Sequence, residues 1–256
     1  MAKILCIYDE GSMINTPLIG AKGFSMLVDS GGKRLLFDTG LKDSYLRRNM
    51  DNLDVDPGSI DVVAVSQAHP DNCRALDGLL SQREAPVDVY APAGLYAAKR
   101  GMLSGSVGLS DDSREKAVLH DITDWVELIP DVWLSPQIEY PDGYRESVLV
   151  VAGTRMAVVS GRGHAGPAPI LDAVSGRFGR NAATFVGAIL LEKKKKPVAQ
   201  SYAAELSARG CTDLHLNHCT GTDGMTNLRT VFGLKGVCDF YVGMTLEVKT
   251  SRRTTG

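Results

Sequence analysis

Short apolar runs that indicate β-strands recur along the whole chain, first as a hairpin and then in alternation with helices. Residues 24–28 and 35–37 flank Ser30-Gly31-Gly32, a tripeptide able to take the positive φ that a tight turn requires. Later apolar runs alternate with helical segments, and this alternation of strand and helix occurs twice along the chain. A hairpin followed by such alternation predicts mixed sheets covered by helices, an α/β layered fold.

The pattern predicts these elements by position. The expected further strands are residues 3–9, 61–66, 87–90, 132–135, 147–151, 156–160, 184–191, 213–216 and 239–246. The expected helices are residues 43–53, 72–80, 170–175, 199–209 and 224–232, and Asp43 is available as an N-cap of the first. Residues 100–112, rich in Gly and Ser, indicate an insertion rather than a linker. We expect one domain over residues 1–256.

The composition excludes several classes of protein. The chain carries 28 basic and 30 acidic side chains, a net charge of -2. It therefore lacks the excess of Lys and Arg that is typical of a nucleic-acid-binding domain. No apolar run approaches the roughly 18 residues of a membrane span, and no signal peptide is visible. The 5 cysteines include no CxxC pair, which favours a reducing compartment. We therefore expect a cytoplasmic protein with a small-molecule substrate and no nucleic-acid or membrane partner, in an oligomeric state left open.

The first of three polar segments, Ser66-Gln67-Ala68-His69-Pro70-Asp71-Asn72, follows an apolar strand directly. Polar residues at the end of a buried strand are held rigidly yet open to solvent, where functional sites tend to lie. The other interpretation is that Asp71 or Asn72 caps the next helix and that His69 is a surface loop residue. This segment alone does not decide between a cap and a site.

The other two segments also follow strands. Residues 160–167 place His164 among glycines, which suits close backbone approach, although a Gly-rich turn with an incidental His looks the same. In residues 215–221, side chains three apart on a strand point to opposite faces, so His218 is the better site candidate. We expect His215 to be packed or capped by its neighbours and Cys219 to be a buried, inert thiol.

One turn carries two aromatic residues, Tyr140 and Tyr144. It could fold over a pocket and stack on a flat ring, but an exposed turn is the commoner arrangement. We expect the exposed turn.

Together these segments resemble the metallo-β-lactamase superfamily in order, spacing and strand-end context, and within it the branch of archaeal dihydropterin (methanopterin-precursor) synthase-like proteins. GFSMLVDSGGKRLLFDTG, ending in Asp38-Thr39-Gly40, is similar to the family's opening hairpin. SGRGHAG and NHCTG are similar to its later loops. The resemblance covers nearly the whole chain and implies an αββα sandwich, in which two mixed sheets are covered by helices.

The sequence departs from the family pattern at metal-binding positions. The family motif is His-x-His-x-Asp-His, and the matching positions here are Gln67, His69, Asp71 and Asn72. Leu190 stands where a further family His would be. Amide oxygens are poor zinc ligands, so two metal ions bridged by hydroxide are not expected.

The resemblance implies at most one firmly held divalent ion, zinc by preference. Its ligands would be His69, Asp71, His164 and His218, with Asp71 and His69 also catalytic. Residues that would contact the substrate or orient the ligands are Gln67, Asn72, Asp38 and Cys219. In the alternative, a metal-free site, three imidazoles and one carboxylate do acid–base chemistry.

The resemblance further implies a hydrolase-type enzyme whose substrate is a small metabolite, with a pterin or a phosphate group as candidate features. A second hypothesis is one-carbon (methyl) transfer from a folate or pterin carrier in a metal-poor pocket, because such chemistry needs no activated water. A third is a non-catalytic ligand-binding protein. One argument stands against the third hypothesis. A chain that had lost its enzymatic activity would be expected to lose motif residues at more positions, whereas His69, Asp71, His164 and His218 are all retained.

Overall fold

Successive apolar side chains of the first strand, β1 (Ala2–Tyr8), enter two different hydrophobic clusters. Ile4 and Cys6 belong to one cluster, whereas Leu5 and Ile7 belong to another. Side chains alternate across a strand, so a strand that is apolar on both faces must lie between two packed layers. The computed structural model, which describes residues 1–96, 108–164 and 166–250 apart from the side chain of His218, has that arrangement.

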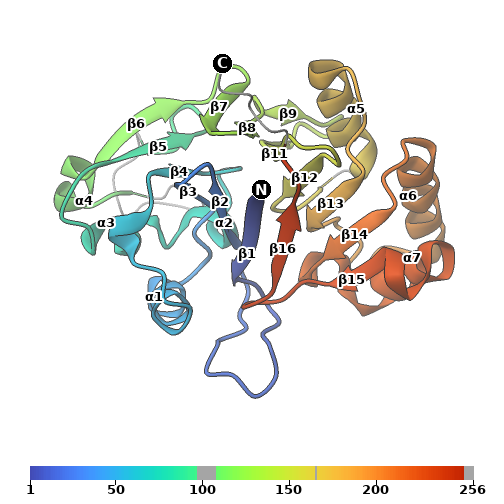
Figure 1. The fold of residues 1–256 in the computed structure, drawn as a ribbon, viewed down its shortest axis with the longest axis horizontal. Coiled ribbons are helices and arrows are strands. Elements are labelled where there is room, and N and C mark those ends of the chain that lie inside the picture. The colour runs from blue at the N-terminus through green and yellow to red at the C-terminus, as the bar shows by residue number, and fades with distance from the viewer. Residues whose placement is uncertain (97–107, 165, 251–256) are drawn as a thin grey trace.

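The first sheet has the strand order β16-β1-β2-β3-β4-β5-β6 (Figure 1). Its remaining strands are β2 (Ser25–Ser30), β3 (Lys33–Phe37), β4 (Val62–Ala64), β5 (Val87–Ala91), β6 (Ala117–Asp121) and β16 (Thr245–Val248). β2 and β3 form the predicted hairpin, turning through Gly31 and Gly32 with φ of 59° and 77°. From β3 to β6 the neighbouring strands are parallel.

The second sheet has the order β15-β14-β13-β12-β11-β8-β7. Its strands are β7 (Val126–Ile129), β8 (Val132–Leu134), β11 (Leu149–Val151), β12 (Ala157–Ser160), β13 (Thr184–Gly187), β14 (Asp213–Leu216) and β15 (Val237–Asp239). From β12 to β15 the strands are parallel. A separate small hairpin joins β9 (Ile138–Glu139) to β10 (Arg145–Glu146).

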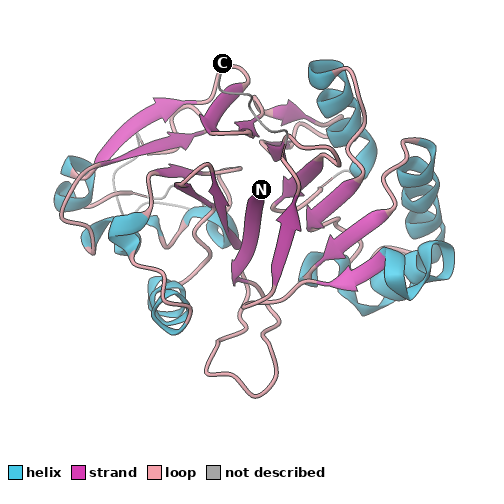
Figure 2. Cartoon of the chain, viewed as in Figure 1, coloured by secondary structure: helices cyan, strands magenta, loops and turns pink. Residues whose placement is uncertain are grey.

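Helices cover the outer face of each sheet (Figure 2). The first sheet carries α1 (Asp43–Asn52), α2 (Pro70–Cys73), α3 (Leu76–Ser81) and α4 (Asp111–Glu115). The second carries α5 (Pro167–Phe178), α6 (Lys196–Ala208) and α7 (Gly221–Gly236). Short 3-10 turns occur at Pro57–Ser59 and His218–Thr220. The predicted αββα sandwich is confirmed.

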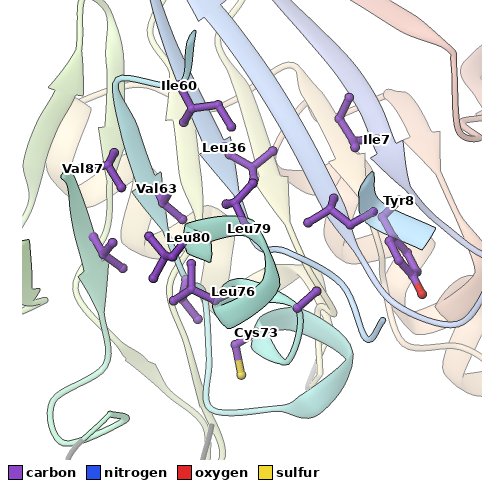
Figure 3. Packing of buried hydrophobic residues seen from close by; sticks show 14 of the residues in the cluster. Ile7, Tyr8, Leu36, Ile60, Val63, Cys73, Leu76, Leu79, Leu80 and Val87 are labelled. Carbon is purple, nitrogen blue, oxygen red and sulfur yellow. The ribbon is translucent and has the colours of Figure 1, made fainter. Parts of the chain in front are cut away.

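The hydrophobic clusters follow these layers. Figure 3 shows Leu76, Leu79 and Leu80 of α3 beside Leu36 and Val63 of the first sheet. A middle cluster combines residues of both sheets. Within the described ranges, no helix has the length and apolarity to cross a bilayer.

Two predicted elements are divided in the structure. The strand expected at 239–246 is two strands in different sheets, β15 and β16, because the chain turns between them at Gly243, with φ of 92°. The helix expected at 72–80 breaks between Cys73 and Leu76, because the N–H of Ala75 donates to the carbonyl of Gly40, 3.1 Å away, in place of a helical partner.

Two smaller differences concern element ends. Asp43 is not the N-cap of α1; Lys42 takes that position, without a side-chain cap. The strand expected at 184–191 ends at Gly187, whose φ of 101° turns the chain out of the sheet. Of the insertion expected at 100–112, residues 100–107 lie outside the described part of the chain.

Candidate functional site

The first two of the three polar segments meet where parallel strands of the two sheets end. The segment after β4 contacts the second sheet through the N–H of Ser147, which donates to the Ser66 carbonyl at 2.8 Å. His69 contacts Arg162, in the loop after β12, at 3.2 Å. Loops at the carboxyl ends of parallel strands are favoured places for binding sites.

Asp38 ties the loop after β4 to the hairpin strand β3. Its carboxylate accepts the N–H and the hydroxyl of Ser66, both at 2.7 Å, and the side-chain amide of Asn72 at 2.6 Å. Asn72 in turn accepts the side-chain amide of Gln67 at 3.0 Å. These contacts support the expectation that Asp38 orients the loop. The side-chain amide of Asn72 is occupied by its hydrogen bonds to Asp38 and Gln67.

Burial raises the pKa of Asp38 to about 7, although its hydrogen bonds from Ser66 and Asn72 lower that pKa. Removal from water disfavours the charged carboxylate, whereas donors to it favour the charge. The negative charge of Glu146 adds to the rise. A carboxyl group that titrates near neutrality therefore lies directly beneath the motif loop.

Close packing against this network explains the glycine at position 161. A Cβ there would lie 2.6 Å from Nδ2 of Asn72 and 2.7 Å from Oδ2 of Asp38. No side chain fits at that distance, so the loop after β12 can approach the Asp38 network only with glycine.

His69 lies at the N-cap of α2 and contacts two charged groups. Nε2 is 3.2 Å from Nη1 of Arg162, and Nδ1 is 3.6 Å from Oδ2 of Asp71. Lys22 approaches the same Asp71 carboxylate at 3.5 Å. Burial, followed by the positive charge of Arg162, lowers the pKa of His69. The imidazole is therefore held in its neutral form near pH 7.

His164 is held by the β9–β10 hairpin. Its Nε2 lies 2.8 Å from Asp142, and its ring stacks on Tyr144 with centroids 3.8 Å apart. The turn at residues 140–144 is exposed at Pro141, Asp142 and Gly143, as expected, but its aromatic residues are not: Tyr140 is only 2% exposed and Tyr144 covers His164. The hairpin folds inward because Tyr140 donates to the buried carboxylate of Glu146.

Glu146 is the anchor of the loop that carries His164. Besides Tyr140, its carboxylate accepts the hydroxyl of Ser160 at 3.1 Å and the N–H groups of Gly163 and His164 at 3.2 and 3.0 Å. A fully buried carboxylate needs such donors to offset its lost hydration. Glu146 thus fixes the backbone on which His164 stands.

The third segment is placed only in part. His218 and Cys219 lie in the 3-10 turn after β14, but the side chain of His218 lies outside the described part of the chain. Cys219 is half-buried rather than buried. The expectation for His215 is confirmed, because its Nε2 pairs with Asp213 at 3.1 Å and its ring packs edge-on against Phe240.

A pocket of about 570 Å³ opens beside the motif loop. Its walls come from that loop, from the β5 end and from the β9–β10 hairpin, and include Gln67, His69, Pro92, Gln137, Tyr144 and Arg145. Its volume falls in the range of roughly 300–1,000 Å³ typical of small-molecule sites.

The donors do not fit a two-ion metal centre in this arrangement. Nε2 of His69 faces the Arg162 guanidinium, and Nε2 of His164 faces Asp142. Among the side chains that the structure describes, no group of three or more His, Cys, Asp or Glu is placed to hold an ion. The single-ion set, which includes His218, stays a prediction.

The sequence did not single out Arg162, Glu146 or Asp142. Arg162 is the one charged residue in a Gly-rich loop, and Glu146 is a lone acid directly before an apolar strand. Each feature draws attention to the residue, but neither distinguishes a buried charge from a surface one. Neither feature identifies the residues that contact the charged group, because those residues lie on other segments of the chain.

Comparison with solved structures places this fold among known ones. A crystal structure of a metal-dependent hydrolase of the β-lactamase superfamily superimposes with a TM-score of 0.79 and 22% identity, over 97% of this chain and 100% of that one. That of a diphosphatase from the PhnP family superimposes with a TM-score of 0.63 and 14% identity, over 98% and 99% of the two chains. These likenesses show the fold.

Sequence comparison agrees. A curated relative, the 7,8-dihydropterin-6-methyl-4-(β-D-ribofuranosyl)-aminobenzene-5′-phosphate synthase of Methanocaldococcus jannaschii, is 30% identical over 98 residues. That stretch is 37% of this chain and 33% of the relative, so it spans about a third of that protein. The sequence model of the metallo-β-lactamase superfamily matches residues 19–205, more than half of the chain. The chain therefore belongs to the metallo-β-lactamase superfamily.

Proposed function

We propose that this protein is a hydrolase-type enzyme whose substrate is a small metabolite with a flat ring and an anionic group. The observation that carries the proposal is the 570 Å³ pocket, which opens on the motif loop at Gln67 and His69. Tyr144 supplies an aromatic ring in its lining, and Arg145, which also pairs with Glu139 at 2.8 Å, a positive charge. An aromatic face suits a planar ring, and a guanidinium suits a carboxylate or phosphate.

The curated relative supports this substrate class. Its printed name describes a product that contains a pterin ring and a 5′-phosphate. A pterin is planar and a phosphate is anionic, so both features have a counterpart in the pocket lining. We therefore propose a pterin-bearing or phosphate-bearing compound as the substrate.

For the chemistry, we assign acid–base roles to His69 and Asp71. The lowered pKa of His69 leaves the imidazole unprotonated near pH 7, as a general base requires. The Asp71 N–H lies 3.3 Å from Nδ1 and its carboxylate 3.6 Å away. Asp71 would therefore orient the ring for this role only in the tautomer with Nδ1 protonated, which leaves Nε2 free to accept a proton. Nε2 can take a proton from water only when Arg162 turns away from it. A single zinc ion on His69, Asp71, His164 and His218 would polarise the scissile bond, but the described donors do not form such a site.

One-carbon transfer from a folate or pterin carrier is the second candidate. The observation that favours it is the contact between Arg162 and His69, which occupies a nitrogen that a metal-activated water mechanism would need. The flat pocket wall at Tyr144 would suit a pterin ring in either reaction.

Hydrolysis of p-nitrophenyl phosphate and bis(p-nitrophenyl) phosphate, with and without added zinc, tests the first proposal. We expect turnover by the wild type and a loss of about 100-fold in His69→Ala, the proposed general base, with an unchanged circular dichroism spectrum. His120→Ala is the matched control, because His120 also pairs with an aspartate, Asp88, but on the β5–β6 pair. Absence of turnover together with calorimetric binding of tetrahydrofolate would favour transfer.

A further inference from the structure

Arg162 is a half-buried cation without a carboxylate partner among the described residues. Its Nη1 contacts the imidazole of His69, and its Nε is buried without a hydrogen-bond acceptor in the part of the chain that the structure describes. By contrast, Arg155 pairs with Asp213 and Arg209 with Asp172. A buried guanidinium donor that lacks an acceptor loses its hydration without compensation, so an external acceptor is expected.

Two side chains that line the pocket also carry polar atoms without described partners. The Tyr144 ring lies 5.9 Å from the guanidinium carbon, and its buried hydroxyl has no described partner. Gln67 is only 2% exposed, yet its Oε1 likewise has no partner among the described residues. Gln67 and Tyr144 both line the 570 Å³ pocket. Buried polar groups are normally satisfied, so orphaned atoms beside one pocket indicate a polar ligand.

The position of Arg162 is set by the backbone. It follows Gly161, which packs against the Asp38 network, and precedes Gly163, whose N–H is held by Glu146 at 3.2 Å. The side chain therefore starts from a fixed point between the two sheets. Pre-organisation of this kind is what an anion-binding arginine needs in order to act without a large entropic cost.

We propose that Arg162 supplies the positive charge at the centre of this site in place of a metal ion and binds an oxyanion of the substrate, a phosphate or a carboxylate. The proposal deepens the proposed function and rests on it for the location of the pocket. Arg162 donates to Nε2 of His69 through an N–H, so this nitrogen must offer its lone pair to the guanidinium. A zinc ion would need the same lone pair, so arginine and zinc compete for it. The guanidinium fork matches two oxygens of a phosphate or carboxylate.

Isothermal calorimetry with inorganic phosphate, and separately with acetate, tests oxyanion binding in the full chain. We expect Arg162→Ala to weaken binding by about 10-fold or more and Arg162→Lys to restore it only in part, because lysine keeps the charge but lacks the fork. The matched control is Arg155→Ala, which removes an exposed arginine paired with Asp213 and should bind as the wild type does. Stronger binding of phosphate or of acetate identifies which oxyanion the site takes.

Equilibrium dialysis against zinc is the second measurement. If Arg162 and zinc compete for His69, Arg162→Ala should bind zinc at least about 10-fold more tightly than the wild type. The proposal is overturned if Arg162→Ala and Arg162→Lys bind the anions within twofold of the wild type, if the wild type binds neither anion, or if it already binds one zinc as tightly as Arg162→Ala. Anion binding that depends on Arg162 without turnover of either aryl phosphate would defeat the hydrolase proposal and leave this one standing.

Discussion

The imidazole of His164 lies flat on the phenol ring of Tyr144, with centroids 3.8 Å apart and planes 17° apart. The same imidazole contacts Asp142 through Nε2 at 2.8 Å. Both partners come from the turn between β9 and β10, so a small hairpin outside the two main sheets fixes the orientation of a motif histidine. That hairpin is therefore part of the candidate site.

The stack predicts a difference between two substitutions of Tyr144. Tyr144→Leu removes the ring face and should lower the free energy of unfolding by about 1 kcal/mol, whereas Tyr144→Phe keeps the stack and should change it by only a few tenths. In proton NMR, the His164 ring protons should move downfield in Tyr144→Leu as the ring current is lost. Equal shifts in the two variants would contradict the stacked geometry.

Glu146 predicts a large loss of stability. Glu146→Ala leaves four donors without their acceptor, those of Tyr140, Ser160, Gly163 and His164. We expect the free energy of unfolding, measured by urea denaturation, to fall by about 3 kcal/mol or more. Glu139→Ala on the same hairpin is the control, because its ion pair with Arg145 is exposed and should contribute less than about 1 kcal/mol. Similar losses in the two variants would count against the anchoring role.

Gly161 and Gly176 form a matched pair of glycine-to-alanine tests. Gly161→Ala places a methyl group 2.6 Å from Asn72 and should destabilise the protein by about 1–3 kcal/mol. A Cβ at Gly176, inside α5, meets nothing within 4 Å, so Gly176→Ala should stabilise by about 0.5–1 kcal/mol. Thermal unfolding gives both values. A neutral Gly161→Ala would mean that the loop after β12 is not packed on Asp38.

The raised pKa of Asp38 predicts a pH dependence of stability. Its folded-state pKa of about 7 lies above the ordinary value of 3.8, so its stabilising contribution is complete below about pH 4 and is lost as the pH rises through 7. Relative to Asp38→Asn, which carries no charge at any pH, the wild type should lose up to about 4 kcal/mol over this range. Urea titrations at pH 4 to 8 measure the difference. A difference that stays constant or grows with pH would refute the assignment.

Local patterns predicted most of the fold. Short continuous apolar runs identified β1, β2 and β3, because both faces of these strands are buried. The break after Cys73 was not predictable, because it depends on the carbonyl of Gly40, a residue far from it in sequence.

For the site, motif spacing led to His69 and to Asp38 as its support. It could not lead to Arg162, because the contact with His69 joins residues 93 positions apart. Likewise, a short acidic residue such as Glu146 looks like any surface carboxylate until the loop it anchors is known. Polar contacts between residues far apart in the sequence produce no repeating pattern from which they could be predicted.

Strand β1 is an interior strand of its sheet, and one of its neighbours is β16, with Ala2 opposite Val248. During synthesis on the ribosome, β1 emerges long before β16, and its hydrogen-bonding edge stays open for that whole interval. Such distant pairings also slow folding. The nascent chain therefore cannot complete the sheet that carries Asp38 and His69 until the strands of the second sheet have been made.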